Sequence, residues 1–279
     1  MKRPIRLLAI DIDGTLLDPH FQVSPANLAA LRRAHAADVE VVLVTGRRHA
    51  FALPIAEQLG FPMWLISSNG AVTKSTAGEP FHRDLLPAST ARRLVAEMDR
   101  FRGNIVITFD KEEKGALVLE RMDELTQSIQ RWLEKNEQFL QFVIPVERAL
   151  TEDPIQTMFC GTVARMREVL DRLAQAAVAS DVTVLRTQYD HRDLCIVDVL
   201  NRGCSKGHAL ERWANHRGYA REQVMAIGDN YNDLEMLAFA GLPVLMGNAS
   251  KELKQSGWPV TLPNDQSGVA AAIEQWVAL

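Results

Sequence analysis

The chain has 279 residues, of which 47% are hydrophobic and 24% charged, with a formal net charge of -4. This balance is typical of a folded globular protein and excludes a disordered or fibrous one. The length exceeds that of most single domains, so we expect two domains or one domain with an insertion. The charge excludes a general basic footprint for nucleic acid, and no apolar run reaches membrane-spanning length.

The cysteines and the N-terminal residues indicate the compartment. Cys160, Cys195 and Cys204 are odd in number and lack metal-ligand spacing, which argues against a disulfide framework or a zinc site. The chain moves from its first residues into an apolar run without a signal-type cleavage region. We therefore expect a cytoplasmic protein with reduced thiols, and the oligomeric state, monomer or homodimer, stays open.

The first expected strand ends in two carboxylates. The apolar run 7–10 has the length of a strand buried on both faces, and Asp11 and Asp13 follow it. Side chains alternate along an extended chain, so these two carboxylates point to the same side. They repel one another unless a cation or a shared proton offsets the charge, and a hard divalent metal is the simplest solution. A polar turn after a core strand is the alternative for this motif alone.

Strands and helices alternate up to residue 83. Ser24-Pro25 has the form of a helix N-cap followed by proline at the first helical position. The next expected elements are a strand at 39–44, a helix at 48–59 and a strand at 63–67. This alternation favours parallel strands whose carboxyl ends share one edge of the sheet. Asp11, Thr45 and Asn69 each follow a strand at that edge, where open α/β sheets bind ligands.

The rhythm changes between residues 84 and 195, which we interpret as a separate α+β domain inserted into the first. The charged stretch 110–115 between two short strands predicts an antiparallel hairpin. Residues 187–193 are unusually polar, for which a surface hairpin is the simpler interpretation and a substrate contact the alternative. The expected helices lie near 87–101, 123–138 and 163–177, and the expected strands near 104–109, 116–120, 155–160, 182–186 and 194–200.

The parallel rhythm resumes towards the C-terminus. A helix begins at Ser205-Lys206, and a buried strand at 224–227 runs into a loop rich in Asp and Asn. The remaining expected elements are a helix at 234–240, a strand at 242–246, a helix at 250–255, a strand at 260–262 and a helix at 269–277. The first domain is thus predicted to comprise 1–83 and 196–279, as a doubly wound parallel sheet.

Four short motifs give the chain a resemblance to a known family. They read Asp11-Ile12-Asp13-Gly14-Thr15, Thr45-Gly46-Arg47, Lys206, and Gly228-Asp229-Asn230-Tyr231-Asn232-Asp233. Together they make almost the whole chain resemble the haloacid dehalogenase superfamily, specifically its Cof-type phosphatases, whose cap domain lies between the second and third motifs. The resemblance implies a Rossmann-like α/β core with an inserted α+β cap domain of the C2B type.

The resemblance also implies a role for each motif. Asp11 would attack the phosphorus of a phosphate monoester and become a transient aspartyl phosphate, and Asp13 would protonate the leaving alcohol and then activate water. Mg²⁺ would be held by the Asp11 carboxylate, the Asp13 backbone carbonyl and Asp229, with Asp233 in support. The phosphoryl oxygens would be bound by Thr45, the Gly46 amide, Lys206 and Asn232.

Simpler roles exist for several of these residues. Lys206 near a helix start is often a solvated lysine, but a cation there opposes the helix dipole, which favours an anionic partner. Thr45 alternatively caps the helix that follows it. The turn at 228–233 alternatively carries capping carboxylates only. Arg47 and Asn69 are candidate substrate contacts, and a surface role fits their sequence context equally well.

We expect a Mg²⁺-dependent phosphatase of small phosphorylated metabolites such as sugar phosphates. A phosphomutase, which also uses an aspartyl phosphate, is the alternative among enzymes. A phospho-accepting signalling module is the alternative outside them, since receiver domains also combine acidic residues, Thr or Ser, and Lys on a doubly wound sheet. The inserted domain counts against that module, as does Asp13, because a receiver needs no acid for a leaving alcohol.

Overall fold

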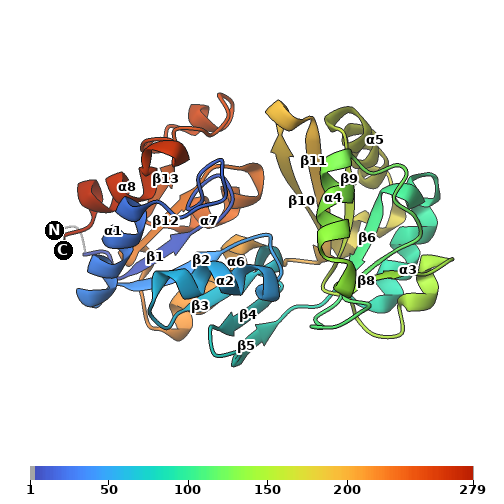
Figure 1. Ribbon diagram of the computed structural model, residues 1–279, viewed down its shortest axis with the longest axis horizontal. Helices are drawn as coiled ribbons and strands as arrows, with labels where there is room; N and C mark the ends of the chain where they lie inside the picture. The colour runs from blue at the N-terminus through green and yellow to red at the C-terminus, as the bar shows by residue number, and fades with distance from the viewer. Residues whose placement is uncertain (1–3, 279) are drawn as a thin grey trace. The chain divides into compact units, whose positions relative to one another are not determined.

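The computed structural model describes residues 4–278, and the chain divides into two compact units (Figure 1). The core unit comprises Met1–Arg83 and Ser205–Leu279, and the inserted unit is Asp84–Cys204. The sequence placed the end of the insertion at residue 195, which is too early. Strand β11 (Leu194–Asn201) runs unbroken through that point and belongs to the sheet of the inserted unit.

The core sheet has the strand order β13-β12-β1-β2-β3-β4-β5. Its strands are β1 (Leu7–Ile10), β2 (Glu40–Val44), β3 (Trp64–Ser67), β4 (Val72–Ser75), β5 (Pro80–Arg83), β12 (Val224–Gly228) and β13 (Leu242–Leu245). From β13 to β3 each neighbouring pair is parallel. The carboxyl ends of these strands therefore lie at one edge of the sheet, although the strands come from both ends of the chain.

Strands β4 and β5 pair antiparallel at the other end of this order, so the expected parallel sheet is a mixed one. The sequence prediction missed both strands because it interpreted the residues after β3 as a polar turn. That turn exists, and Ser68, Asn69 and Gly70 all have positive φ there, at 50°, 54° and 105°. Two consecutive non-glycine residues in this region are uncommon. The turn reverses the chain at once and returns it to the sheet.

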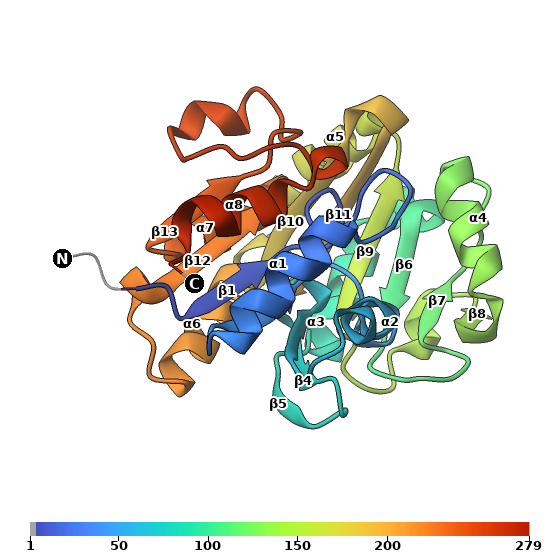
Figure 2. The ribbon, with the colours of Figure 1, turned by 60° about the vertical axis from the view of Figure 1, so that its left-hand side comes forward.

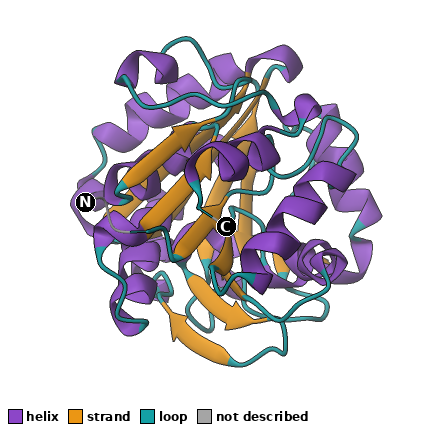
Figure 3. Ribbon diagram, turned by 90° about the vertical axis from the view of Figure 1, so that its left-hand side faces the viewer, coloured by secondary structure: helices purple, strands orange, loops and turns teal. Residues whose placement is uncertain are grey.

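Helices cover both faces of the core sheet. They are α1 (Pro25–Ala36), α2 (His49–Leu59), α6 (Lys206–His216), α7 (Leu234–Phe239) and α8 (Gly268–Trp276). Leu8 and Ile10 of β1 pack with α1, α2 and α8, whereas Leu7 and Ala9 pack with α6 and α7. Figure 2 shows α1 and α8 side by side, and Figure 3 shows helices on both sides of the core strands. This confirms the predicted doubly wound α/β fold.

The inserted unit has a sheet of its own, with the order β10-β11-β9-β6-β7-β8. Its further strands are β6 (Ile105–Thr108), β7 (Leu117–Leu119), β8 (Leu140–Phe142), β9 (Gln156–Gly161) and β10 (Val182–Tyr189), and its helices are α3 (Ala88–Glu97), α4 (Gln127–Lys135) and α5 (Val163–Ala174). Leu94 of α3 and Val169 of α5 pack with Phe159 of β9 in one hydrophobic cluster. The antiparallel pairing of β6 with β7 confirms the predicted charged hairpin, and the polar stretch 187–193 is the tip of the β10–β11 hairpin.

Short elements account for the other differences. The sequence prediction missed β8, which is too short to show a pattern. The helix expected at 250–255 is a 3-10 helix at Leu253–Ser256, and the strand expected at 260–262 is a single bridge from Val260 to Leu245. The cysteines are buried and form no disulfide within residues 4–278. Across that same stretch, none of the helices combines the length and apolar character needed to cross a membrane.

Candidate active site

Three neighbouring strands end in polar residues of the predicted site. Asp11 follows β1, Thr45 follows β2 and Asp229 follows β12. Because β1 is paired in parallel with both β2 and β12, these residues leave the sheet at the same edge. The topology therefore brings together motifs that lie far apart in the sequence.

Lys206 contacts two carboxylates of this edge. Its Nζ donates to Oδ1 of Asp11 and to Oδ1 of Asp233, each at 2.6 Å, and the residue is fully buried. Lys206 opens α6, where the Oγ of the N-cap Ser205 accepts from the backbone N–H of His208 at 3.2 Å. A buried ammonium group is costly unless carboxylates pair with it. The alternative of a solvated lysine is therefore wrong.

Asp11, Asp229 and Asp233 form a buried group with carboxylate oxygens that lie within 4.8 Å of one another. Burial and the charge of Asp233 raise the pKa of Asp11 to about 7, and burial and the charge of Asp11 raise the pKa of Asp229 well above its ordinary value. Burial opposes the charged form of Lys206, but the two adjacent carboxylates outweigh it and raise the pKa of that lysine.

These pKa shifts test whether the residues fit a divalent cation. The pKa of Asp11 is raised by its burial and by the nearby charge of Asp233, and the Lys206 ammonium in contact with it offsets this only in part. Carboxylate oxygens are the ligands that hard divalent ions prefer. The charge and the donor atoms of the group therefore fit a divalent metal ion.

Gly14 lets the loop after β1 approach Asp229. It has φ of +83°, and a Cβ at this position would lie 2.3 Å from Oδ2 of Asp229, so both conformation and space require glycine. Thr15 Oγ1 donates to Oδ1 of Asp229 at 3.1 Å. Asn248, which the sequence prediction missed, donates from Nδ2 to the Gly14 carbonyl oxygen at 2.8 Å. It follows β13 at the same edge. A search for polar residues after every parallel strand, β13 included, would therefore have found it.

Asp233 organises the loop after β12. Its Oδ2 accepts from the backbone N–H groups of Asp229 and Asn230, both at 3.0 Å, and its Oδ1 accepts from Lys206. The loop is thus a capped turn, as the simpler interpretation of 228–233 required. It is a buried turn whose capping carboxylate also contacts the lysine.

A second group at this edge comprises Asn232, Asn69, Thr45 and Gly46. Asn232 Nδ2 donates to Oδ1 of Asn69 at 2.9 Å, and both residues are buried. A Cβ on Gly46 would lie 3.2 Å from that same oxygen. Thr45 Oγ1 accepts from the backbone N–H of Arg47 at 3.1 Å. The alternative that Thr45 caps α2 is wrong, because α2 starts further along the chain with another N-cap residue.

Arg47, suggested by the sequence as a substrate contact, binds Asp13 through two atoms. Its Nε lies 2.7 Å from Oδ2 and its Nη2 lies 2.6 Å from Oδ1. The two side chains are 28% and 27% exposed, so the pair lies at the surface of the site. A bidentate contact of this kind fixes the direction of the carboxylate as well as its position.

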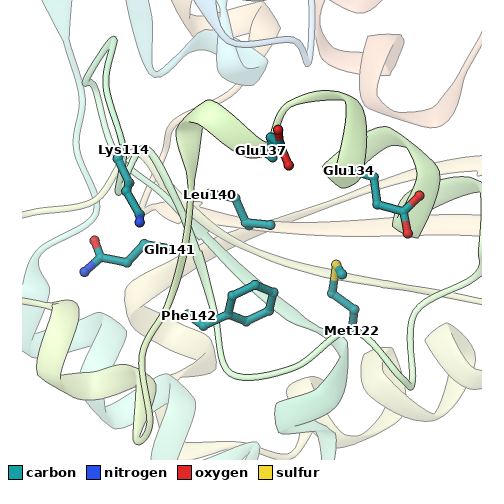
Figure 4. Close-up of a pocket in the computed structure, with 7 residues that line it drawn as sticks. All are labelled: Lys114, Met122, Glu134, Glu137, Leu140, Gln141 and Phe142. Carbon is teal, nitrogen blue, oxygen red and sulfur yellow. The ribbon is translucent and has the colours of Figure 1, made fainter.

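A pocket of about 560 Å³ lies in the inserted unit. Its lining consists of Lys114, Met122, Glu134, Glu137, Leu140, Gln141 and Phe142 (Figure 4). Most of these side chains are exposed, and none belongs to the motifs. We therefore assign this pocket no part in the candidate site.

The chain matches the family model of haloacid dehalogenase-like hydrolases over residues 8–273. It is 30% identical to phosphatase YwpJ of Bacillus subtilis (strain 168), over 95% of this chain and 98% of that protein. It is also 30% identical to HMP-PP phosphatase of Serratia proteamaculans (strain 568), over 98% of this chain and 95% of that protein. The solved structure of a haloacid dehalogenase-like hydrolase from B. subtilis matches with a TM-score of 0.80 at 27% identity, over 98% of this chain and 100% of that one.

Proposed function

The chain belongs to the haloacid dehalogenase-like hydrolases and is a Cof-type phosphatase, a phosphoric monoester hydrolase. We propose that it cleaves small phosphate monoesters through an aspartyl phosphate on Asp11, with Mg²⁺ as cofactor. The observation that carries this proposal is the contact of Lys206 with both Asp11 and Asp233 at 2.6 Å. It joins a nucleophile, a cation and an acidic loop from distant parts of the sequence. Catalysis of phosphoryl transfer depends mainly on the positioning of the reacting groups and on electrostatic stabilisation by such charges.

Asp11 supplies the nucleophile in this proposal. A carboxylate oxygen of Asp11 forms a bond to phosphorus while the bond from phosphorus to the ester oxygen breaks, and the leaving oxygen takes a proton from Asp13. Water then attacks the phosphorus of the aspartyl phosphate and gives a proton to Asp13, and the Asp11 carboxylate leaves. One alcohol and one inorganic phosphate are released, and both side chains return to their starting state.

Arg47 acts on Asp13 in this scheme. The guanidinium engages both carboxylate oxygens, and each oxygen keeps a second lone pair for the proton that passes between Asp13 and the alcohol or water. Arg47 therefore orients the acid. It is a positioning residue, because it acts through Asp13.

The phosphoryl group is bound by donors on both sides of Asp11. Lys206 and Asn232 present an ammonium and an amide, and Asn69 orients the Asn232 amide by accepting its hydrogen bond at 2.9 Å. The Thr45 hydroxyl and the Gly46 N–H complete the set. Donors arranged in advance stabilise the charge that develops on the phosphoryl oxygens in the transition state.

Mg²⁺ would be held by the carboxylates of Asp11 and Asp229 and by the backbone carbonyl of Asp13, with Asp233 holding the loop. When bound, the ion would offset the negative charge shared by the phosphate and the carboxylates. The group supports this assignment, because burial and mutual repulsion raise the pKa of Asp11 and of Asp229, and a divalent cation would offset both effects.

The proposal is tested by measuring inorganic phosphate released from a panel of phosphorylated metabolites, sugar phosphates included, by the full-length protein with Mg²⁺. Asp11→Asn should abolish release, because an amide is not a nucleophile here. The exposed Asp265→Asn is the matched control and should behave as the wild type. Wild-type release by Asp11→Asn would contradict the proposal. Isomerisation of a sugar phosphate without release would establish a phosphomutase instead.

A further inference from the structure

Asn248 lies outside the four motifs, yet its side chain reaches the acidic group. It is in the turn after β13, the strand next to β12 in the core sheet. Its Nδ2 donates to the Gly14 carbonyl oxygen at 2.8 Å and lies 3.4 Å from Oδ2 of Asp229. An amide nitrogen carries two hydrogens. One side chain therefore contacts both the loop after β1 and the loop after β12.

The other end of the Asn248 amide sets its direction. Its Oδ1 accepts from the backbone N–H of Asn264 at 2.9 Å, so the nitrogen faces Gly14 and Asp229. Asn264 also donates from its own Nδ2 to the carbonyl oxygen of Leu17 at 2.8 Å, in a buried contact. Two asparagines thus tie the loop after β1 to the segments that follow β13.

We propose that Asn248 is a positioning residue that raises the affinity of the protein for its divalent cation, an inference that rests on the Mg²⁺ binding of the proposed function. Asp229 is approached from two sides, by Thr15 Oγ1 at Oδ1 and by Asn248 at Oδ2. The same amide contacts the carbonyl oxygen of Gly14, which lies so close to Asp229 that a Cβ at this position would not fit. A carboxylate that is already oriented loses less conformational freedom when a cation binds.

The magnitude expected from such a contact is large enough to measure. Loss of a hydrogen-bonding partner of a metal ligand typically weakens metal binding by roughly 10–100-fold. The side chain of Asn248 is solvent-exposed overall, so its removal leaves no cavity in the core. A change in cation affinity is therefore separable from a change in folding.

The test titrates the full-length protein, free of substrate, with Mg²⁺ alone in a calorimeter. Asn248→Ala removes the amide. Asn136→Ala is the matched control, because Asn136 Nδ2 also donates to a backbone carbonyl at 2.8 Å, that of Trp132, but belongs to the inserted unit. Asp229→Asn removes a proposed ligand and is the reference for loss of Mg²⁺ binding. Melting temperatures of the metal-free variants report the fold.

The inference predicts that the Mg²⁺ dissociation constant of Asn248→Ala rises tenfold or more, while that of Asn136→Ala matches the wild type. Asn248→Ser, which is too short to reach Gly14, should give the same rise and replaces Asn248→Ala if that variant does not fold. If the wild type binds Mg²⁺ and Asp229→Asn does not, an unchanged dissociation constant of Asn248→Ala overturns the inference. The proposed function then still stands. A wild type that does not bind Mg²⁺ overturns both.

Discussion

Arg47 binds both carboxylate oxygens of Asp13, with Nε 2.7 Å from Oδ2 and Nη2 2.6 Å from Oδ1. The pair connects the loop after β2 to the loop after β1 and orients the proposed acid and base. Each oxygen keeps a second lone pair through which a proton can pass to or from the leaving group. We therefore expect Arg47 to fix the direction of Asp13 throughout the catalytic cycle.

Arg47→Lys keeps the charge at this position but loses the bidentate contact. We expect kcat to fall about 10²-fold on alkyl phosphates, the usual order for general acid catalysis. The fall should be much smaller on p-nitrophenyl phosphate, whose leaving group needs little protonation. Arg33→Lys is the control, because Arg33 forms an exposed pair with Glu274 at 3.0 Å. Equal losses on both substrates would argue against a role through Asp13.

Alanine substitutions at Gly14 and Gly78 distinguish backbone strain from steric crowding, because the two glycines have nearly the same φ, +83° and +84°. A Cβ on Gly14 would lie 2.3 Å from Oδ2 of Asp229, whereas one on Gly78 would meet nothing within 4 Å. We expect Gly78→Ala to lower the free energy of unfolding by about 1–2 kcal/mol and to keep phosphatase activity. Gly14→Ala should lose activity and the stabilisation by Mg²⁺ as well. Thermal unfolding and phosphate release measure both, and a fully active Gly14→Ala would contradict the close approach of this loop.

Lys206→Met removes the only cation hydrogen-bonded to Asp11 in the described contacts and leaves two buried carboxylates in its place. Breaking a buried ion pair typically costs about 3–5 kcal/mol, and we expect a loss of this order at pH 8 by urea unfolding. The loss should be smaller at pH 5, because Asp11, with a pKa of about 7, is then protonated. A loss that is independent of pH would mean that Asp11 is not the group left unpaired.

The pKa of Asp11 also predicts how Mg²⁺ stabilises the protein. In the metal-free protein this pKa is about 7, against an ordinary value of 3.8. Between these values the folded protein holds a proton that the unfolded chain has released, so stability falls as the pH rises through this window. Mg²⁺ needs the ionised carboxylate and competes with that proton.

We therefore expect the rise in melting temperature caused by Mg²⁺ to be larger at pH 8 than at pH 6. Differential scanning fluorimetry at both pH values measures it. Asp229→Asn, which lacks a proposed ligand, should show little rise at either pH. A rise that is larger at pH 6 in the wild type would count against Asp11 as a ligand.

The edge that gathers Asp11, Thr45 and Asp229 was predictable, because alternating strands and helices favour parallel strands whose carboxyl ends share one edge of the sheet. The same reasoning missed β4 and β5, because it ended the sheet at the polar turn after β3, whereas that turn reverses the chain and returns it to the sheet. The chemical roles of the gathered residues stay predictions.

Contacts between side chains that lie far apart in the sequence could not be predicted from it. Arg47 and Asp13 are 34 residues apart, and Thr15 and Asp229 are 214 apart, so no local pattern links them. Asn248 lies in a turn outside every motif. Its place after β13 makes it a candidate from the sequence, but its contacts with Gly14 and Asp229 are seen only in the structure.

Covalent transfer of the phosphoryl group to Asp11 is tested most directly by chemical trapping. The protein is mixed with substrate and Mg²⁺ and quenched with borohydride, which reduces an aspartyl phosphate to homoserine, and the peptides are then read by mass spectrometry. We predict homoserine at position 11 when substrate is present, and none without substrate or in Asp11→Asn. Steady turnover with position 11 unmodified, or with the modification at another aspartate, would contradict the account.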